Sequence, residues 1–307
     1  MSPAAVFRLL TFVLLLMPPG QPHAQALAVL HPELNGAYRN VVNDVLQGVE
    51  EQSHVRPRAY AIATSTDTAE LRNNLRTSKA LIVLGRQSLK LASTLDSGLP
   101  LVVGGVYPGN DSEQLAGISM MPDPALLFGM LKNLLPAVKR VMVVYHPQAS
   151  ESQIRLAREA ARAQGLDFSA LEASDLVGAA HAYEALLSTA DGRRDALWLP
   201  QDATTVEEST ILPMLLKESW SRNLPVFSSS VLHVKKGVLF GMYPNHVQLG
   251  HDLAQLASSL QNGEPVKRGL LPLRALNSAL NSRTASHLGL QLGPVQLRQF
   301  DAFFPEL

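Results

Sequence analysis

The sequence predicts an α/β protein built from two doubly wound, parallel-sheet lobes of the Rossmann-like kind. Short apolar or β-branched runs alternate with longer stretches of helical spacing from Leu27 onward, and this alternation is typical of parallel sheets with helices on both faces. The runs at residues 81–84 (LIVL) and 141–144 (VMVV) are continuously apolar, which indicates strands buried on both faces. The pattern occurs twice, over about residues 27–117 and 118–231, so we expect two similar lobes with a cleft between them.

The predicted elements follow one another as strand, helix and strand along most of the chain. Val, Ile, Leu or Ala dominate the predicted strands, at residues 27–30, 59–63, 80–84, 100–103, 140–145, 167–170, 196–199, 225–227 and 238–242. Apolar residues recur at helical spacing in the predicted helices, at residues 35–52, 68–77, 124–134, 152–164, 181–190, 207–222 and 245–261. Most strands therefore lead into a helix, which is the connection that parallel strands require.

The first 26 residues have the features of a secretory signal peptide. Arg8 precedes an apolar run at residues 9–17 (LLTFVLLLM), which is too short for a membrane span of about 20 residues. Residues 24–26 (AQA) supply the small-x-small pattern after which signal peptidase cuts. An uncleaved N-terminal anchor is the alternative. Because no Cys follows the signal, no lipid anchor is expected, and the protein is predicted to be free in a periplasm.

The charge balance and the lack of cysteine exclude several classes of protein. The 307-residue chain carries 26 Lys and Arg against 26 Asp and Glu, so it has no basic field for binding nucleic acid. Without Cys it has no disulfide framework, thiolate zinc site or cysteine nucleophile. We therefore expect no nucleic-acid partner.

Motifs of known catalytic chemistry are not found in the sequence. It contains no Gly-x-Ser-x-Gly elbow, no Gly-x-x-x-x-Gly-Lys phosphate loop and no His-Glu-x-x-His helix. The nine His residues are scattered, and His246 and His251 are five positions apart, so they do not share a helical face as an i, i+4 pair would. We expect no enzyme activity, no cofactor and no metal. A hydrolase with an unrecognised site is the alternative.

Polar side chains at the ends of the predicted strands indicate a binding site. In open α/β sheets the ligand lies at the carboxyl ends of the strands, where helix N-termini present unpaired N–H groups. Hydroxyls, amides and one carboxylate occur there, a set that suits a small polar or zwitterionic ligand better than bond breaking. The candidate ligand-binding residues are His31, Pro32, Gln87, Ser119, Ser150, Asp202 and Ser228.

Several segments, densest between residues 117 and 290, carry a family resemblance. They are residues 195–202 (DALWLPQD), 223–229 (NLPVFSS), 234–240 (VKKGVLF), 249–254 (LGHDLA), 260–265 (LQNGEP), 276–281 (LNSALN) and 284–290 (TASHLGL). Their order and spacing resemble the ABC-transporter substrate-binding protein family that includes tryptophan and tyrosine receptors. Residues 117–119 and 135–141 are similar to the family's interdomain crossing and its Pro-initiated strand.

The resemblance implies a periplasmic-binding-protein type I-like fold, in which two lobes joined by three crossovers enclose a ligand by hinge closure. The N-terminal lobe would comprise residues 27–117 and 233–267, and the C-terminal lobe residues 118–232 and 268–307. Such a protein would be a monomer that binds a small molecule and delivers it to an ABC permease.

Asp202 is the expected centre of the site. In family members that bind aromatic amino acids, a strand-end Asp pairs with the ligand ammonium, and Asp202 matches it by position. The resemblance therefore implies an amino acid-like ligand, with aromatic amino acids included. Capping of a helix from Thr205 is the alternative role for this carboxylate.

One turn departs from the family pattern. Residues 145–150 (YHPQAS) stand where many relatives carry a Tyr-Asn-Pro-Gly-Glu-like turn, so the ligand contact of that Asn is not transferred to this chain. In contrast, His31 and Pro32 match the family's His-Pro after its first strand. The departure favours an alternative function, a periplasmic sensory or accessory binding protein that docks on a membrane signalling protein.

Overall fold

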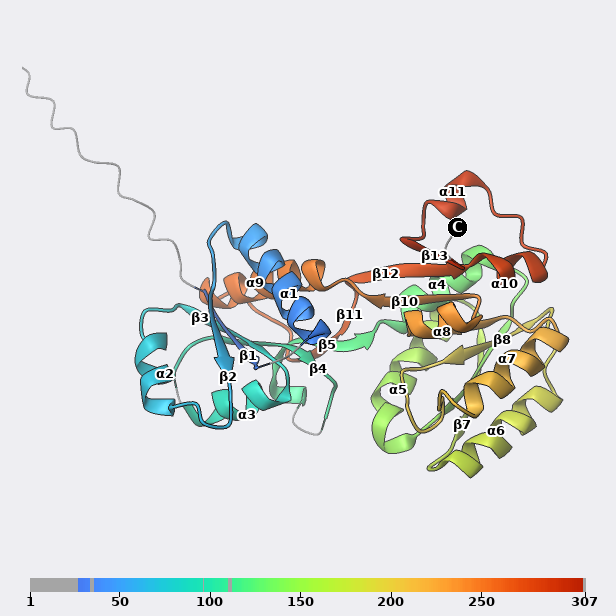
Figure 1. Ribbon diagram of the computed structural model, residues 1–307, viewed down its shortest axis with the longest axis horizontal. Helices are drawn as coiled ribbons and strands as arrows, with labels where there is room; N and C mark the ends of the chain where they lie inside the picture. The colour runs from blue at the N-terminus through green and yellow to red at the C-terminus, as the bar shows by residue number, and fades with distance from the viewer. Residues whose placement is uncertain (1–26, 34–35, 96, 110–111, 306–307) are drawn as a thin grey trace, which may run out of the picture.

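The structure is a computed structural model that describes residues 27–33, 36–95, 97–109 and 112–305. The predicted signal peptide at residues 1–26 lies outside the described residues. Figure 1 shows two lobes joined by a narrow bridge of extended chain. Within the described part of the chain, no helix combines the length and the hydropathy that a membrane span needs.

The first lobe is built on a six-stranded, wholly parallel sheet in the order β11-β5-β4-β3-β1-β2. Its strands are β1 (Leu27–Pro32), β2 (Arg58–Ile62), β3 (Ala80–Leu84), β4 (Leu101–Val106), β5 (Ala116–Pro122) and β11 (Gly269–Leu273). Its helices are α1 (Ala37–Ser53), α2 (Thr68–Leu75), α3 (Arg86–Leu95) and α9 (His246–Gln261), with the short η1 (Ser112–Gln114). Apolar side chains of α1 and α9 pack on one face of the sheet, and those of α2 and α3 pack on the other.

The second lobe is built on a seven-stranded sheet in the order β13-β12-β10-β9-β8-β6-β7, in which only the β10–β12 pair is antiparallel. Its strands are β6 (Arg140–Tyr145), β7 (Asp167–Glu172), β8 (Asp195–Leu199), β9 (Val226–Ser228), β10 (Phe240–Pro244), β12 (Leu276–Asn281) and β13 (Ala302–Phe304). Its helices are α4 (Pro124–Leu134), α5 (Pro147–Ala163), α6 (Leu176–Ser188), α7 (Ile211–Ser221), α8 (Val231–Lys236), α10 (Ser282–His287) and α11 (Pro294–Leu297).

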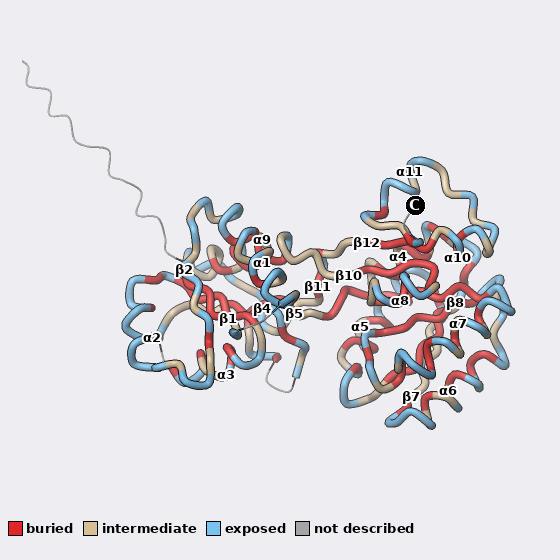
Figure 2. Tube along the Cα trace, viewed as in Figure 1, coloured by how far each residue is buried: buried red, intermediate tan, exposed pale blue. Residues whose placement is uncertain are grey.

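The predicted fold class is confirmed, because both sheets are doubly wound. In the second lobe, α4 and α5 pack with Trp198 on one face, and α6 and α7 pack on the other. Figure 2 shows the inner strands of both sheets as buried, whereas the edge strands β2, β7 and β11 are mostly intermediate or exposed. The continuously apolar strand β3 is buried at every position, and so is β8, whose first residue is Asp195.

The boundaries between the lobes differ from the sequence prediction. Strand β10 was assigned to the N-terminal lobe with residues 233–267, but it pairs with β9 and β12 in the second sheet. Strand β11 and residues 118–122 of β5 were assigned to the C-terminal lobe, but they pair in the first sheet. The prediction misplaced them because strand pairing, which is a tertiary property, decides the lobe of each segment.

The three crossovers between the sheets therefore follow β5, β10 and β11, and they are bonded to one another. The Asp123 amide donates to Leu273 O at 2.8 Å, and the Asn245 amide donates to Ala275 O at 2.9 Å. Arg274 forms an ion pair with Asp123. These bonds hold the three crossovers in one bundle between the lobes.

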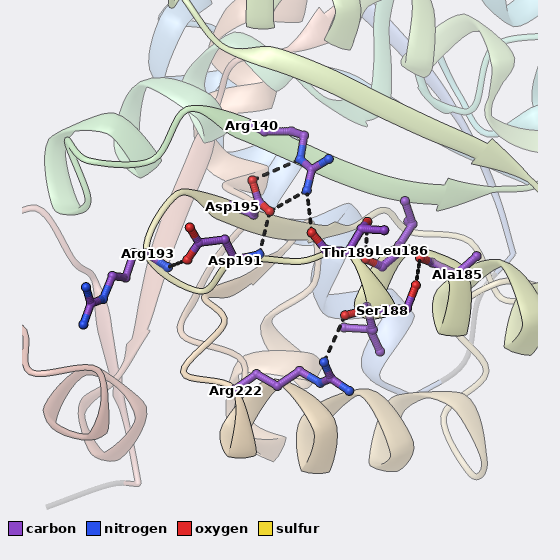
Figure 3. A network of polar contacts seen from close by, with 10 residues as sticks. Arg140, Ala185, Leu186, Ser188, Thr189, Asp191, Arg193, Asp195 and Arg222 are labelled. Atoms are coloured by element: carbon purple, nitrogen blue, oxygen red, sulfur yellow. Dashed lines mark hydrogen bonds and ion pairs between the residues drawn. The ribbon is translucent and has the colours of Figure 1, made fainter.

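A polar network fixes the amino ends of the second sheet (Figure 3). Arg140 in β6 donates from Nε and Nη2 to the two carboxylate oxygens of Asp195 in β8, at 3.0 and 2.5 Å. Asp195 also accepts from the Asp191 amide at 2.8 Å, and Arg140 donates to Thr189 O at 3.3 Å. The Asp195 hydrogen bonds raise the pKa of Arg140. This network joins two strands at the edge of the sheet opposite to the strand ends considered below.

Candidate functional site

The carboxyl edges of the two sheets face each other, and one hydrogen bond connects them. Tyr107 follows β4 in the first lobe, and its hydroxyl donates to Oε1 of Gln201, which follows β8 in the second lobe, at 2.8 Å. Arg86 at the start of α3 donates to Tyr107 O at 2.9 Å and so holds the tyrosine backbone. The segments that follow β4 and β8 therefore meet between the lobes.

Asp202 and Ser150 lie together and bond to each other. Asp202 is 5% exposed, and its Oδ2 accepts from the His146 amide at 2.7 Å and from Ser150 Oγ at 3.2 Å. Oδ1 accepts from the amides of Thr204 and Thr205, at 3.0 and 3.2 Å. A carboxylate has about four acceptor sites, so these internal donors occupy the whole group.

This arrangement resembles the capping alternative, with one difference. The backbone after Asp202 forms turns, and the next helix, α7, begins only at Ile211. Asp202 therefore closes a turn after β8 and at the same time holds the start of α5, which belongs to a different strand–helix unit. The Asp202 carboxylate thus fixes the turn after β8 and the start of α5 relative to each other, at the carboxyl edge of the second sheet.

Ser228 lies inside the second lobe. Its side chain is fully buried; its hydroxyl is 3.1 Å from Leu199 O and 2.7 Å from Nδ1 of His233, and it accepts from the Ser230 amide at 3.1 Å. The hydroxyl thus joins the end of β8 to the start of α8. Through these bonds Ser228 holds the loop after β9 in place.

The four candidates in the first lobe lie on three elements. His31 and Pro32 end β1, where both are half-buried and His31 Nδ1 donates to Pro32 O at 2.9 Å. Gln87 is exposed near the start of α3. Ser119 is 1% exposed within β5 and accepts from the Met121 amide at 3.2 Å. Of these four, Gln87 is the most open to a ligand.

Two functional candidates were missed in the sequence. Tyr107 is 48% exposed and reaches the second lobe, yet it lies in an irregular segment after β4 that carries no periodic signal. The second is Tyr145 at the end of β6, whose hydroxyl lies 2.9 Å from Glu172 and 3.1 Å from Glu151. Burial and then these two carboxylates raise the pKa of Tyr145 to about 12, so the phenol stays protonated and the two Glu side chains add negative charge to this edge.

Among the described residues, no three His, Asp or Glu side chains come together. The polar groups of the site are hydroxyls, amides and carboxylates on two facing edges. Such an arrangement can hold a polar organic molecule by hydrogen bonds from both sides.

The buried His233 gives a testable pH dependence. Burial lowers the pKa of its imidazole. The nearby Glu208 carboxylate raises this pKa and the Lys236 ammonium lowers it, both by less than burial does. Because the unfolded chain then binds the proton more readily, stability is complete above the ordinary His pKa of about 6.5 and falls as the pH drops below it.

We expect His233→Gln to reduce the loss of unfolding free energy between pH 7 and pH 5, by up to about 1 kcal/mol per pH unit. Urea unfolding followed by Trp fluorescence at several pH values measures this slope. An unchanged slope in the variant would contradict the assignment.

Comparison with known proteins gives one family and many structures. The sequence model described as "ABC transporter substrate binding protein" matches residues 110–294. No curated protein matches the chain.

Three solved structures represent the similar folds. A substrate-binding protein with adhesive properties from Clostridium difficile, solved in its ligand-free, open form, has 16% identity and a TM-score of 0.64, covering 91% of this chain and 98% of its own. The ABC domain from Streptococcus pneumonia in complex with L-Trp has 15% identity and a TM-score of 0.54, covering 91% and 100%. A conserved domain protein from Vibrio cholerae has 16% identity and a TM-score of 0.53, covering 91% and 99%. At these identities the likeness concerns the fold.

Proposed function

This chain belongs to the ABC transporter substrate-binding protein family, and we propose that it is an exported receptor that captures a small organic ligand between its lobes and delivers it to an ABC importer. The observation that carries the proposal is the Tyr107–Gln201 hydrogen bond. It joins the carboxyl edges of two sheets that are otherwise connected through three bonded crossovers. Two rigid lobes with such a connection can close on a ligand by hinge motion.

The proposed ligand is an amino acid or a similar zwitterion, aromatic ones included. Hydroxyl and amide groups on the facing edges can hold a carboxylate, and the Glu151 and Glu172 carboxylates beside Tyr145 favour an ammonium group. The S. pneumonia relative was solved with L-Trp. In our proposal Tyr107, Gln87 and Gln201 contact the ligand, while Asp202, Ser150 and Ser228 hold the loops that present these contacts.

The route of delivery follows from the same proposal. A signal peptide at residues 1–26 would export the chain to the periplasm as a monomer, and the closed lobes would dock on an ABC permease. The turn at His146 favours a second function, a receptor that docks on a membrane signalling protein. His146 stands where many relatives carry an Asn that contacts the ligand. Here the His146 amide donates to Asp202, and no Asn side chain is present at this position to contact a ligand.

A thermal-shift screen tests the ligand class. The panel contains the twenty amino acids, nucleosides and small carboxylates, each at millimolar concentration. A ligand at about 100 times its Kd stabilises the folded state by about 2.7 kcal/mol, so at least one amino acid should raise Tm by several degrees. A panel in which only nucleosides or simple carboxylates stabilise the protein would refute the proposed ligand class.

Tyr107→Phe tests the contact between the lobes. Removing one hydroxyl should leave the unfolding free energy within about 1 kcal/mol of wild type, because the ring and the backbone bond from Arg86 remain. The lobes should separate further on average, which small-angle X-ray scattering would detect as a larger radius of gyration. Tyr38→Phe is the control, since Tyr38 is 69% exposed on α1. Identical scattering for Tyr107→Phe and wild type would mean that the bond does not restrain the lobes.

A further inference from the structure

A cavity of about 470 Å³ lies in the second lobe, away from the interlobe site. It is enclosed by the last turns of α7 and α8, the beginning of β9, the end of β12 and helix α10. These segments meet at the amino edge of the parallel strands, whereas the interlobe site lies at the carboxyl edge. Figure 1 places α7 and α10 in the part of the second lobe farthest from the first lobe.

The polar part of the cavity wall is basic. Lys217, Lys235, Lys236 and Arg283 line it, and among the residues that the structure describes no Asp or Glu does. Lys236 forms an ion pair with Glu208 at 2.8 Å. Lys217 is exposed and forms no hydrogen bond or ion pair with the described residues. Among the described residues, Lys217, Lys235 and Arg283 form no ion pair, and such unpaired positive charge favours an anionic ligand.

One wall is aromatic. Trp220 is 41% exposed and stacks on His287, with ring centroids 3.6 Å apart and an interplanar angle of 12°. His287 also donates from Nε2 to Trp220 O at 3.0 Å, and the Arg283 guanidinium lies 5.8 Å from the Trp220 ring centroid. The indole is thus fixed in place while much of its surface stays open to solvent.

Apolar side chains form another part of the cavity wall, which we call its apolar floor. They are Leu216, Leu224, Val226, Leu288 and Pro305. Pockets of about 300–1,000 Å³ with apolar walls and a few convergent polar groups are typical of small-molecule sites. A fixed aromatic side chain, apolar side chains and basic groups in one cavity together favour a ligand that has an apolar body and a negative charge.

We propose that this cavity binds a small organic anion with an apolar body, such as an aryl carboxylate. The ring packs against Trp220 and the apolar floor, and the carboxylate is held by Lys217 and Arg283. The site is separate from the proposed function and does not depend on it, because no residue of the cavity lies at the interlobe edge.

A ¹⁹F NMR titration of the full chain with 4-fluorobenzoate tests the proposal. Saturable binding is expected, weakened at least tenfold in the Lys217→Gln/Arg283→Gln double variant. Both side chains are exposed, so the variant should keep the wild-type circular dichroism and Tm. Lys79→Gln, which changes an exposed lysine of the first lobe, should bind as wild type.

The neutral 4-fluorobenzamide is the matched probe for charge, and it should bind at least tenfold more weakly than the carboxylate. Binding of the amide and the carboxylate with equal affinity would overturn the anion site, since the pocket would then recognise only the ring. Equal affinity of the double variant and wild type for 4-fluorobenzoate would place the binding elsewhere and overturn the proposal, as would the lack of saturation at millimolar concentrations.

Discussion

Gly48→Ala is expected to lower the free energy of unfolding of the first lobe by about 3 kcal/mol. A Cβ at this position of α1 would lie 1.9 Å from Val247 O and 3.0 Å from the His251 amide nitrogen of α9. The reverse contact is equally close, since a Cβ on Gly250 would lie 2.2 Å from Val45 O. The obstacles are backbone atoms, which cannot move aside as a flexible side chain could, so the two helices must separate.

The consequence should be confined to one lobe. Helix α9 attaches the segment between two crossovers to the first lobe, so its separation from α1 loosens that lobe and leaves the second sheet intact. Hydrogen exchange should increase in peptides covering α1 and α9 and stay unchanged in β6 and β7. Trp fluorescence does not report the first lobe, because the chain's two Trp residues, Trp198 and Trp220, both lie in the second.

Gly129→Ala is the matched control in α4. A Cβ there would meet only Gln164 Nε2, at 3.9 Å, so the substitution should stabilise the protein by about 0.5–1 kcal/mol through helix propensity. A Gly48→Ala protein as stable as wild type would show that α1 and α9 are not held at this distance in solution.

Much of the fold could be predicted because burial on both faces leaves a local signal. Strands β3 and β6 and helix α4 begin and end where the apolar pattern places them. Helix α4 also carries two start signals, the Asp123 cap and Pro124 at its first position. Where pattern and cap agree, local sequence is sufficient.

The elements that were missed lack such signals. Strand β11 contains Pro272, which speaks against a strand, but β11 lies at the edge of its sheet, where Pro is tolerated, and its register shifts between Leu271 and Leu273. Helix α3 follows β3 with only Gly85 between them, in a left-handed conformation with φ of 81°, so no cap marks its start. The start of α5 was predicted late, at residue 152, although Pro147 occupies its first turn.

The sequence indicates where strands end, but it does not indicate which side chains contact one another there. The seven candidates lie at or near strand ends, except Ser119, which lies within β5. Which of them bond to each other depends on units more than fifty positions apart, such as Asp202 with His146 and Ser150. The Tyr107–Gln201 contact spans 94 positions and two lobes, so only the tertiary structure could reveal it.

Asp202→Ala should lower the free energy of unfolding of the second lobe by about 4 kcal/mol. The substitution leaves three backbone N–H groups and one hydroxyl without their acceptor at a position where Asp202 is only 5% exposed. Each buried donor left unsatisfied costs about 1–3 kcal/mol. Urea unfolding followed by Trp198 fluorescence reports this lobe directly, because the Trp198 indole is fully buried in its core and bonded to Ser229.

Asp175→Ala separates the effect of this network from that of an ordinary cap. Asp175 is exposed and accepts one hydrogen bond, from the Gly178 amide at 2.7 Å, at the start of α6, so its loss should cost only about 1 kcal/mol. The comparison also decides between the two roles considered for Asp202. A carboxylate reserved for a ligand ammonium could be replaced with little loss of stability, whereas a carboxylate that holds two strand–helix units together cannot. Similar unfolding free energies for Asp202→Ala and Asp175→Ala would therefore favour a ligand-binding role for Asp202. A difference of about 3 kcal/mol would establish that Asp202 holds the loops at the carboxyl edge in place.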